Sequence, residues 1–131
     1  MPTANKSRRP AAKKVSHAAL LGKHGPVAVK AFRKELGLKR RQFARLTAAS
    51  DRAVADWENG QPISPVNQKS LRESERLCRA LMTIMKPDQV GQWLDTPNDA
   101  YSGLKPLDLV ERGEMDRLWR MIFEVESGAL T

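Results

Sequence analysis

The sequence has few of the residues from which catalytic and metal sites are built. Its 131 residues include one cysteine and two histidines, which exclude an internal disulfide and leave too few ligands for a convincing metal site. The cysteine, Cys78, lies on an apolar stripe, where we expect a buried core side chain rather than a reactive thiol. No Ser/His/Asp or Cys/His arrangement stands out. We therefore predict that the protein is not an enzyme and has no catalytic residues, metal or cofactor.

Long apolar runs are also missing. No stretch reaches eighteen consecutive apolar residues, so we expect no membrane-spanning helix. Residues 1–14 are charged but contain no apolar segment, which is unlike a signal peptide. Together with the single cysteine, these features favour a cytoplasmic protein in a reducing compartment.

Acidic residues are absent from the first 25 residues, and the charge is unevenly spread. Residues 1–25 carry six basic residues and no acidic ones. Residues 26–60 carry eight basic and four acidic residues, and residues 61–131 carry nine basic and eleven acidic residues. The three segments therefore have charges of +6, +4 and −2 within a net charge of +8. A basic front is typical of a protein that meets a polyanion. A solvated tail that only keeps the protein soluble is an equal alternative for the basic start.

From Pro26 onward, apolar residues recur at helical spacing, and no useful stretch alternates as a strand would. The sequence therefore predicts an all-α fold. The expected helices span residues 26–36, 39–48, 51–58, 65–86, 87–94, 107–110 and 114–127. Gly37 is expected to end the first helix, and Ser50 to cap the third. Ser64, followed by Pro65, opens the long fourth helix.

Between Gly37 and Gly60, two short predicted helices are joined by a three-residue turn at 48–50. Inward positions on both helices are apolar, and the positions between them are polar and face outward. The inward residues are Phe43, Ala44, Leu46, Val54 and Trp57. A second helix presented in this way fits the major groove of DNA. The Gly-Leu start, Phe-Ala-x-Leu centre and Trp-Glu-Asn-Gly end resemble the Xre/Cro family of helix-turn-helix proteins.

The outward positions of this stretch are the predicted DNA-binding residues. They are Lys39, Arg40, Arg41, Arg45, Ser50, Asp51, Arg52, Ala55 and Asp56. Lys39 stands where the family usually has a Ser or Thr cap, and two acids place negative charge on the reading face. The arginines and the basic arm should therefore supply most of the affinity for DNA, and this affinity should fall steeply as the salt concentration rises. A plain three-helix bundle with a basic face is the alternative.

A second, sparser pattern follows in the back half. It consists of Trp93-Leu-Asp-Thr-Pro-Asn98, Gly103-Leu-Lys-Pro106 and the stretch from Leu109 to Gly113. This order of residues resembles the toxin-binding domain of the Xre/MbcA/ParS antitoxin family, which follows an Xre-like helix-turn-helix in that family. The resemblance implies an antitoxin of a type II toxin–antitoxin system that neutralises a RES-like, NAD-consuming toxin and represses its own operon. Inhibition would be steric, with the carboxyl-terminal segment approaching the toxin's active site.

The last predicted helix carries a broad apolar arc. Its members are Met115, Leu118, Trp119, Ile122, Phe123 and Val125, and most of them are expected to face the protein's own core. Met121 falls just outside the arc and Glu126 within it, so an interface at these positions is as plausible as solvent exposure. The predicted toxin-binding residues are Met121, Glu124, Glu126, Gly128, Ala129, Leu130 and Thr131.

The sequence thus predicts three segments. Residues 1–24 form a basic flexible arm, residues 25–62 an Xre/Cro-like DNA-binding domain, and residues 63–131 a helical toxin-binding domain that begins with a long connecting helix. Expected partners are a RES-like toxin, operator double-stranded DNA and a second copy in a homodimer, so the protein would be nucleoid-associated when bound to DNA. The alternative is a free-standing Xre-family transcription regulator whose carboxyl-terminal domain serves for dimerisation.

Overall fold

The computed structural model describes residues 25–128, and the predicted arm at 1–24 and residues 129–131 lie outside the described residues. Between residues 25 and 128 the chain forms seven α-helices and one short 3-10 helix, without a strand. The elements are α3 (Gly25–Glu35), α4 (Arg40–Thr47), α5 (Asp51–Glu58), α6 (Pro65–Leu81), α7 (Pro87–Leu94), η1 (Asp99–Tyr101), α8 (Pro106–Glu111) and α9 (Met115–Glu126). The predicted all-α fold is confirmed. No helix in this part of the chain is long and apolar enough to cross a membrane.

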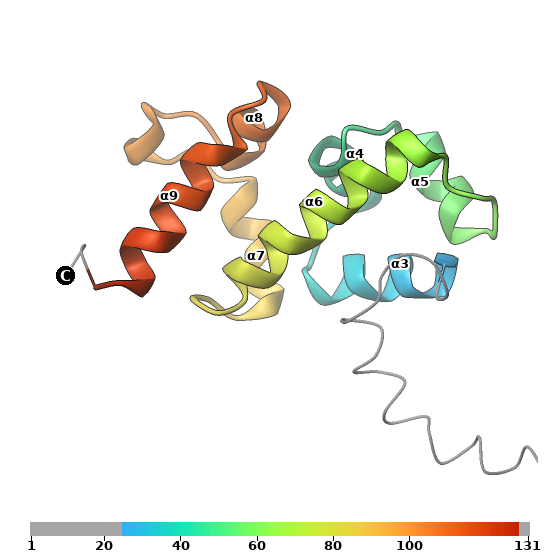
Figure 1. Ribbon diagram of the computed structural model, residues 1–131, viewed down its shortest axis with the longest axis horizontal. Helices are drawn as coiled ribbons and strands as arrows, with labels where there is room; N and C mark the ends of the chain where they lie inside the picture. Colours follow the sequence, from blue (N-terminus) through green and yellow to red (C-terminus); the bar gives the residue numbers. More distant parts are fainter. Residues whose placement is uncertain (1–24, 129–131) are drawn as a thin grey trace, which may run out of the picture.

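The long helix α6 runs through the middle of the molecule (Figure 1). Helices α3, α4 and α5, which we call the front bundle, gather around its first half (Figure 1). Helices α7, α8 and α9, which we call the back bundle, gather around its second half. The two bundles also touch directly, because α3 contacts α7 and α4 contacts α8.

The local signals for helix ends act as the sequence predicted. Gly37 follows α3 with a φ of 72°, in the left-handed region that glycine adopts without steric cost. The side chain of Ser50 accepts a hydrogen bond from the Ala53 amide at 2.9 Å, and that of Ser64 accepts one from the Asn67 amide at 3.3 Å. Proline is the first residue of α6, α7 and α8. These signals hold because each operates within one turn of helix.

The predicted end of α6 is wrong. The apolar stripe suggested a helix reaching residue 86, but α6 ends at Leu81. The Thr83 amide donates to the Ala80 carbonyl at 3.1 Å and the Ile84 amide to the Leu81 carbonyl at 3.0 Å, three residues back rather than four. The hydroxyl of Thr83 also donates to the Ala80 carbonyl, at 2.6 Å. This side chain and the tighter turn satisfy the last carbonyls and end the helix early.

Both bundles share one continuous apolar core. Trp57 and Val54 are buried in it, as the helix-turn-helix pattern predicted. The largest fully buried side chains come from α3, α4, α6, α7, α8, α9 and the connector after α3: Phe32, Phe43, Leu36, Leu46, Leu71, Leu77, Leu81, Leu94, Leu107, Leu109 and Leu118. Cys78 is fully buried among them, and burial raises the pKa of its thiol to about 12, as expected for a core side chain.

The two bundles meet backbone to backbone where α7 crosses the end of α3. The amide of Gly91 donates to the Leu36 carbonyl at 2.8 Å. A Cβ atom at residue 91 would lie 2.7 Å from the backbone oxygens of both Leu36 and Gly37, closer than real Cβ contacts. Only glycine therefore lets α7 approach the front bundle to this distance.

We expect Gly91→Ala to destabilise the protein. Backbone oxygens cannot rotate away from the added methyl group, so α7 must shift outward, and overpacking of this kind costs about 1–3 kcal/mol. The better helix propensity of alanine offsets about 1 kcal/mol of that cost. We therefore expect the free energy of unfolding, measured by urea titration, to fall by about 1 kcal/mol, and by about 2 kcal/mol at most.

The matched control is Gln89→Ala, an exposed position on the same helix. It should stay within about 0.5 kcal/mol of the wild type. An unchanged urea midpoint for Gly91→Ala would contradict the close crossing of α7 and α3.

Candidate functional site

A buried ion pair holds the front bundle in shape. The guanidinium of Arg33 on α3 donates to the Glu58 carboxylate of α5 at 2.7 and 3.2 Å and to the Leu38 carbonyl at 3.0 Å. Burial disfavours the charged carboxylate, but the hydrogen bonds from Arg33 and Arg40 outweigh that effect and lower the pKa of Glu58. Sequence analysis missed this pair, because nothing in the local pattern connects residues on separate helices.

The first turn of α4 presents three predicted DNA-binding cations. Lys39, Arg40 and Arg41 are all exposed. Arg40 contacts Glu58 at 3.3 Å, whereas no ion pair involves Arg41 within residues 25–128. The Lys39 side chain does not cap α4, as expected for a lysine at this position. Instead, the Gln42 side chain accepts a hydrogen bond from the Lys39 amide at 2.7 Å.

The start of α5 presents the next group of predicted residues. Ser50, Asp51 and Arg52 are exposed there, and Ala55 and Asp56 are half-buried further along the helix. Arg52 and Asp56 form an exposed i,i+4 ion pair at 3.6 Å. Helices α4 and α5 contact each other, so the structure brings all these residues onto neighbouring parts of the front bundle.

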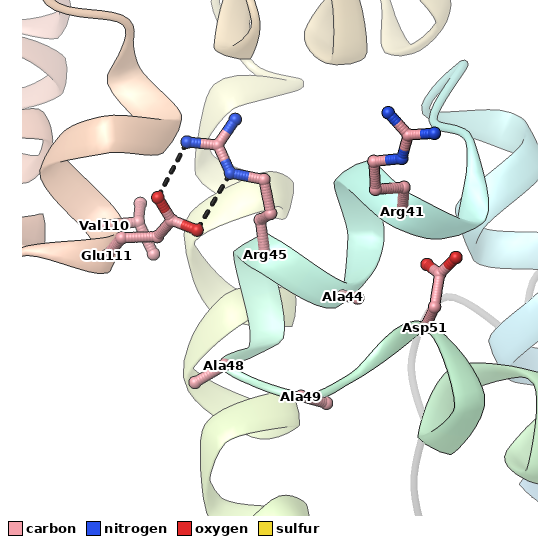
Figure 2. A pocket seen from close by; sticks show the side chains of 8 residues that line it. All are labelled: Arg41, Ala44, Arg45, Ala48, Ala49, Asp51, Val110 and Glu111. Carbon is pink, nitrogen blue, oxygen red and sulfur yellow. Dashed lines mark hydrogen bonds and ion pairs between the residues drawn. The ribbon is translucent and has the colours of Figure 1, made fainter.

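Arg45 is the exception, because its side chain points to the back bundle. Its guanidinium donates to both oxygens of Glu111 at 2.9 and 2.8 Å (Figure 2). It also donates to Asp108 at 2.9 Å. A third carboxylate, Asp95 at the end of α7, lies 3.9 Å away. We call these four residues the Arg45 clasp. It joins α4 to α7 and α8.

Contacts within the clasp shift the pKa values of its four members. The hydrogen bond from Arg45 lowers the pKa of Glu111, and hydrogen bonds from the Lys105 amide and then Arg45 lower that of Asp108. Burial opposes ionisation of Asp95, but hydrogen bonds from Gln42 and Lys105 prevail and lower its pKa as well. The Arg45 pKa is raised, chiefly by Glu111. All four groups are therefore charged at neutral pH.

A hollow of about 520 Å³ lies beside the clasp (Figure 2). Alanines from α4 and the following turn line it together with Val110, and its polar groups are Arg41, Arg45, Asp51 and Glu111. It opens between the two predicted DNA-reading helices and α8. No cluster of His, Cys, Asp or Glu suited to a metal occurs within the described ranges.

Helix α9 turns most of its apolar arc toward the core, as expected. Four of the six members are buried in the core or packed against it, but Phe123 is 64% exposed and Val125 40%. Phe123 lies against the half-buried Trp119, with ring centroids 6.4 Å apart. We call these two residues the aromatic pair.

The predicted toxin-binding residues fall on two sides of α9. Met121 and Glu124 line a hollow of about 280 Å³ with the short helix η1. Glu126 lies elsewhere, and its carboxylate, 2.8 Å from the Thr83 hydroxyl, shares that single proton with the Ala80 carbonyl. Gly128 follows the helix with a φ of 81°. The other three predicted residues lie outside the described residues: Ala129, Leu130 and Thr131.

The fold and these surfaces define a small all-helical protein with exposed cations on its front bundle and, on its back bundle, an aromatic pair in which Phe123 is exposed. No protein-family model matches the chain. The chain is similar to the mycobacterial cidal antitoxin MbcA of Mycobacterium bovis and of Mycobacterium tuberculosis. Identity to each is 33% over 94 residues, which covers 71% of this chain and 83% of the relative. A probable mycobacterial cidal antitoxin of M. tuberculosis is 33% identical over 79 residues, 60% of this chain and 68% of that relative.

A solved structure agrees with this similarity. A chain of the crystal structure of the M. tuberculosis MbcT–MbcA toxin–antitoxin complex aligns with a TM-score of 0.63 and 32% identity. The alignment covers 76% of this chain and 91% of that chain. The chain belongs to the MbcA family of antitoxins, which confirms the resemblance found in the sequence.

The Arg45 clasp should make stability depend on pH. Glu111 has a pKa below its ordinary value of 4.5, so its contribution is complete above that value and is lost as the pH falls through the folded-state pKa. We expect Glu111→Gln to melt at a lower temperature than the wild type at neutral pH. The difference in melting temperature between Glu111→Gln and the wild type should narrow as the pH falls from about 5 to about 3.

Asp95, Asp108 and Glu58 are present in both proteins, so the difference isolates Glu111. Glu124→Gln, which removes an exposed carboxylate from α9, serves as the control and should melt like the wild type throughout. Parallel melting-temperature curves for Glu111→Gln and the wild type would contradict this role of the clasp.

Proposed function

We propose that this protein is an antitoxin that binds a toxin through the back bundle and its operator through the front bundle. The observation that carries the proposal is the aromatic pair, with Phe123 exposed, on the last helix of a chain that belongs to an antitoxin family. The resemblance in the sequence implies that the toxin is a RES-like, NAD-consuming enzyme. Inhibition would then be steric, and this chain would need no catalytic group.

The aromatic pair is the proposed centre of the toxin contact. Aromatic side chains that protrude from a helix dominate the energetics of many protein interfaces, because their burial excludes much water. Polar groups surround the pair, with Glu126 one turn from Phe123, and this arrangement of an apolar centre within a polar rim is typical of interfaces. A MbcA relative is found in a complex with the toxin MbcT, which supports a partner of that kind.

The front bundle is the proposed DNA contact. Arg41 and Arg52 are exposed at the starts of α4 and α5, where side chains and backbone N–H groups commonly meet phosphates. The outward side of α5 would face the bases, and Asp51 and Asp56 would limit affinity there. A homodimer that reads paired half-sites would give autorepression of the operon, in the cytoplasm and on the nucleoid.

We expect Phe123→Asp to abolish toxin binding without unfolding the protein. A charge at the centre of the interface should cost about 2–4 kcal/mol, or about a 30- to 1000-fold loss of affinity. The measurement is calorimetric titration of the full chain with the toxin encoded beside its gene, accompanied by rescue of growth on co-expression.

Val66→Asp is the matched control, because Val66 is 76% exposed and is the second residue of α6. The start of α6 lies with the front bundle, at the opposite end of this helix from α9 (Figure 1). It should bind the toxin as the wild type does. Equal affinities for Phe123→Asp and the wild type would move the toxin contact elsewhere. A wild type that binds its operator but not the neighbouring protein would favour the free-standing regulator.

We expect Arg41→Ala and Arg52→Ala each to weaken operator binding and to reduce its dependence on salt. Each lost phosphate contact should lower the slope of log K against log salt by about 0.9. The measurement is fluorescence anisotropy at several salt concentrations, on a duplex carrying the promoter upstream of the gene.

Arg120→Ala removes the same charge from an exposed position on α9 and is the control. Its salt slope should equal that of the wild type. If all three variants have the same slope, the effect is one of net charge and the front bundle is not the contact surface.

A further inference from the structure

The Arg45 clasp occupies a side chain that the sequence assigned to DNA. Arg45 lies four residues after Arg41, so the two side chains leave the same face of α4. Both line the hollow that also includes Asp51 at the start of α5 (Figure 2). Arg45 therefore lies at the edge of the proposed DNA surface, yet its donors are directed to α8.

We propose that Glu111 and Asp108 act as an internal substitute for a DNA phosphate and hold Arg45 out of the DNA contact. The inference rests on the proposed DNA binding by the front bundle. A carboxylate that takes two parallel hydrogen bonds from a guanidinium uses the same donors that a phosphate would use. Glu111 takes two donors at 2.9 and 2.8 Å, and Asp108 shares one of them at 2.9 Å.

The remaining donor group of Arg45 is also directed to a carboxylate. Its Nη1 lies 3.9 Å from Asp95, and Asp95 is held in place by Gln42 at 2.8 Å and by Lys105 at 3.1 Å. Every nitrogen of the guanidinium thus faces an acid from α7 or α8. A phosphate approaching Arg45 must displace one of these acids or meet their negative charge.

Exposure of the clasp allows such a displacement. The side chains of Arg45 and Glu111 are 28% and 46% exposed, so water already reaches the pair and its net stabilisation is modest. Loss of Glu111 should therefore release Arg45 while the apolar core remains intact. The clasp then sets how tightly the front bundle binds DNA.

A double-mutant cycle separates this masking from a general effect of charge. The full-length wild type, Glu111→Gln, Arg45→Ala and the double variant are titrated against a fluorescent duplex carrying the promoter upstream of the gene. Glu111→Gln should bind about three- to tenfold more tightly than the wild type, as expected for one added hydrogen bond of typical net strength. Its salt slope should steepen by about 0.9. In the Arg45→Ala background, Glu111→Gln should change nothing.

Glu111→Asp supplies a second variant that keeps the negative charge and shortens its reach by one methylene. It should also bind DNA more tightly than the wild type, by less than Glu111→Gln. Circular dichroism melting of each protein shows that the variants compared are folded, and Glu111→Asp carries the test if Glu111→Gln is not.

Two results would overturn the masking role. One is equal DNA affinity for the wild type and the Glu111 variants. The other is an equal gain for Glu111→Gln with and without Arg45, which would mean that only net charge matters. A wild type and a Glu111→Gln variant that both fail to bind DNA at low salt would remove the proposed DNA binding itself, and the inference with it.

Discussion

The two bundles are joined by a contact between backbones, where the Gly91 amide donates to the Leu36 carbonyl at 2.8 Å. A side chain at residue 91 would separate α7 from the end of α3, because both neighbouring oxygens belong to the backbone. With α7 fixed there, Asp95 at its end comes within 2.8 Å of Gln42 on α4. The approach of α8 to Arg45 follows from the same packing, since α7 and α8 contact each other.

Helix α8 links the two proposed surfaces. It contacts α4 on one side and α9 on the other, although it is only six residues long. The surfaces proposed to contact DNA and the toxin are therefore built on one continuous core. The same compactness explains why Arg45, a cation suited to phosphate, is instead engaged by carboxylates of the back bundle.

Sequence reasoning succeeded where the physical cause is local. Ser50 and Ser64 cap helices through amides three residues away, and Trp57 and Val54 are buried because helical periodicity places them on one side of α5. It failed at the end of α6, where a threonine side chain and a tighter turn outweighed the apolar stripe. It placed most of the α9 arc correctly but did not single out Phe123 as exposed, because periodicity identifies an apolar face without showing whether another helix covers all of it.

The sequence by itself determined the all-helical fold, the positions of most helix ends, the front bundle's exposed cations and the resemblance to an antitoxin family. Each depends on residues a few positions apart, or on a pattern read along the chain. Only the tertiary structure decided which arginine of the front bundle is bound by carboxylates of the back bundle, and which apolar side chains stay exposed. The partners of Arg45 are 63 and 66 residues away in sequence, and they reach it because glycine at residue 91 lets the two bundles pack backbone to backbone.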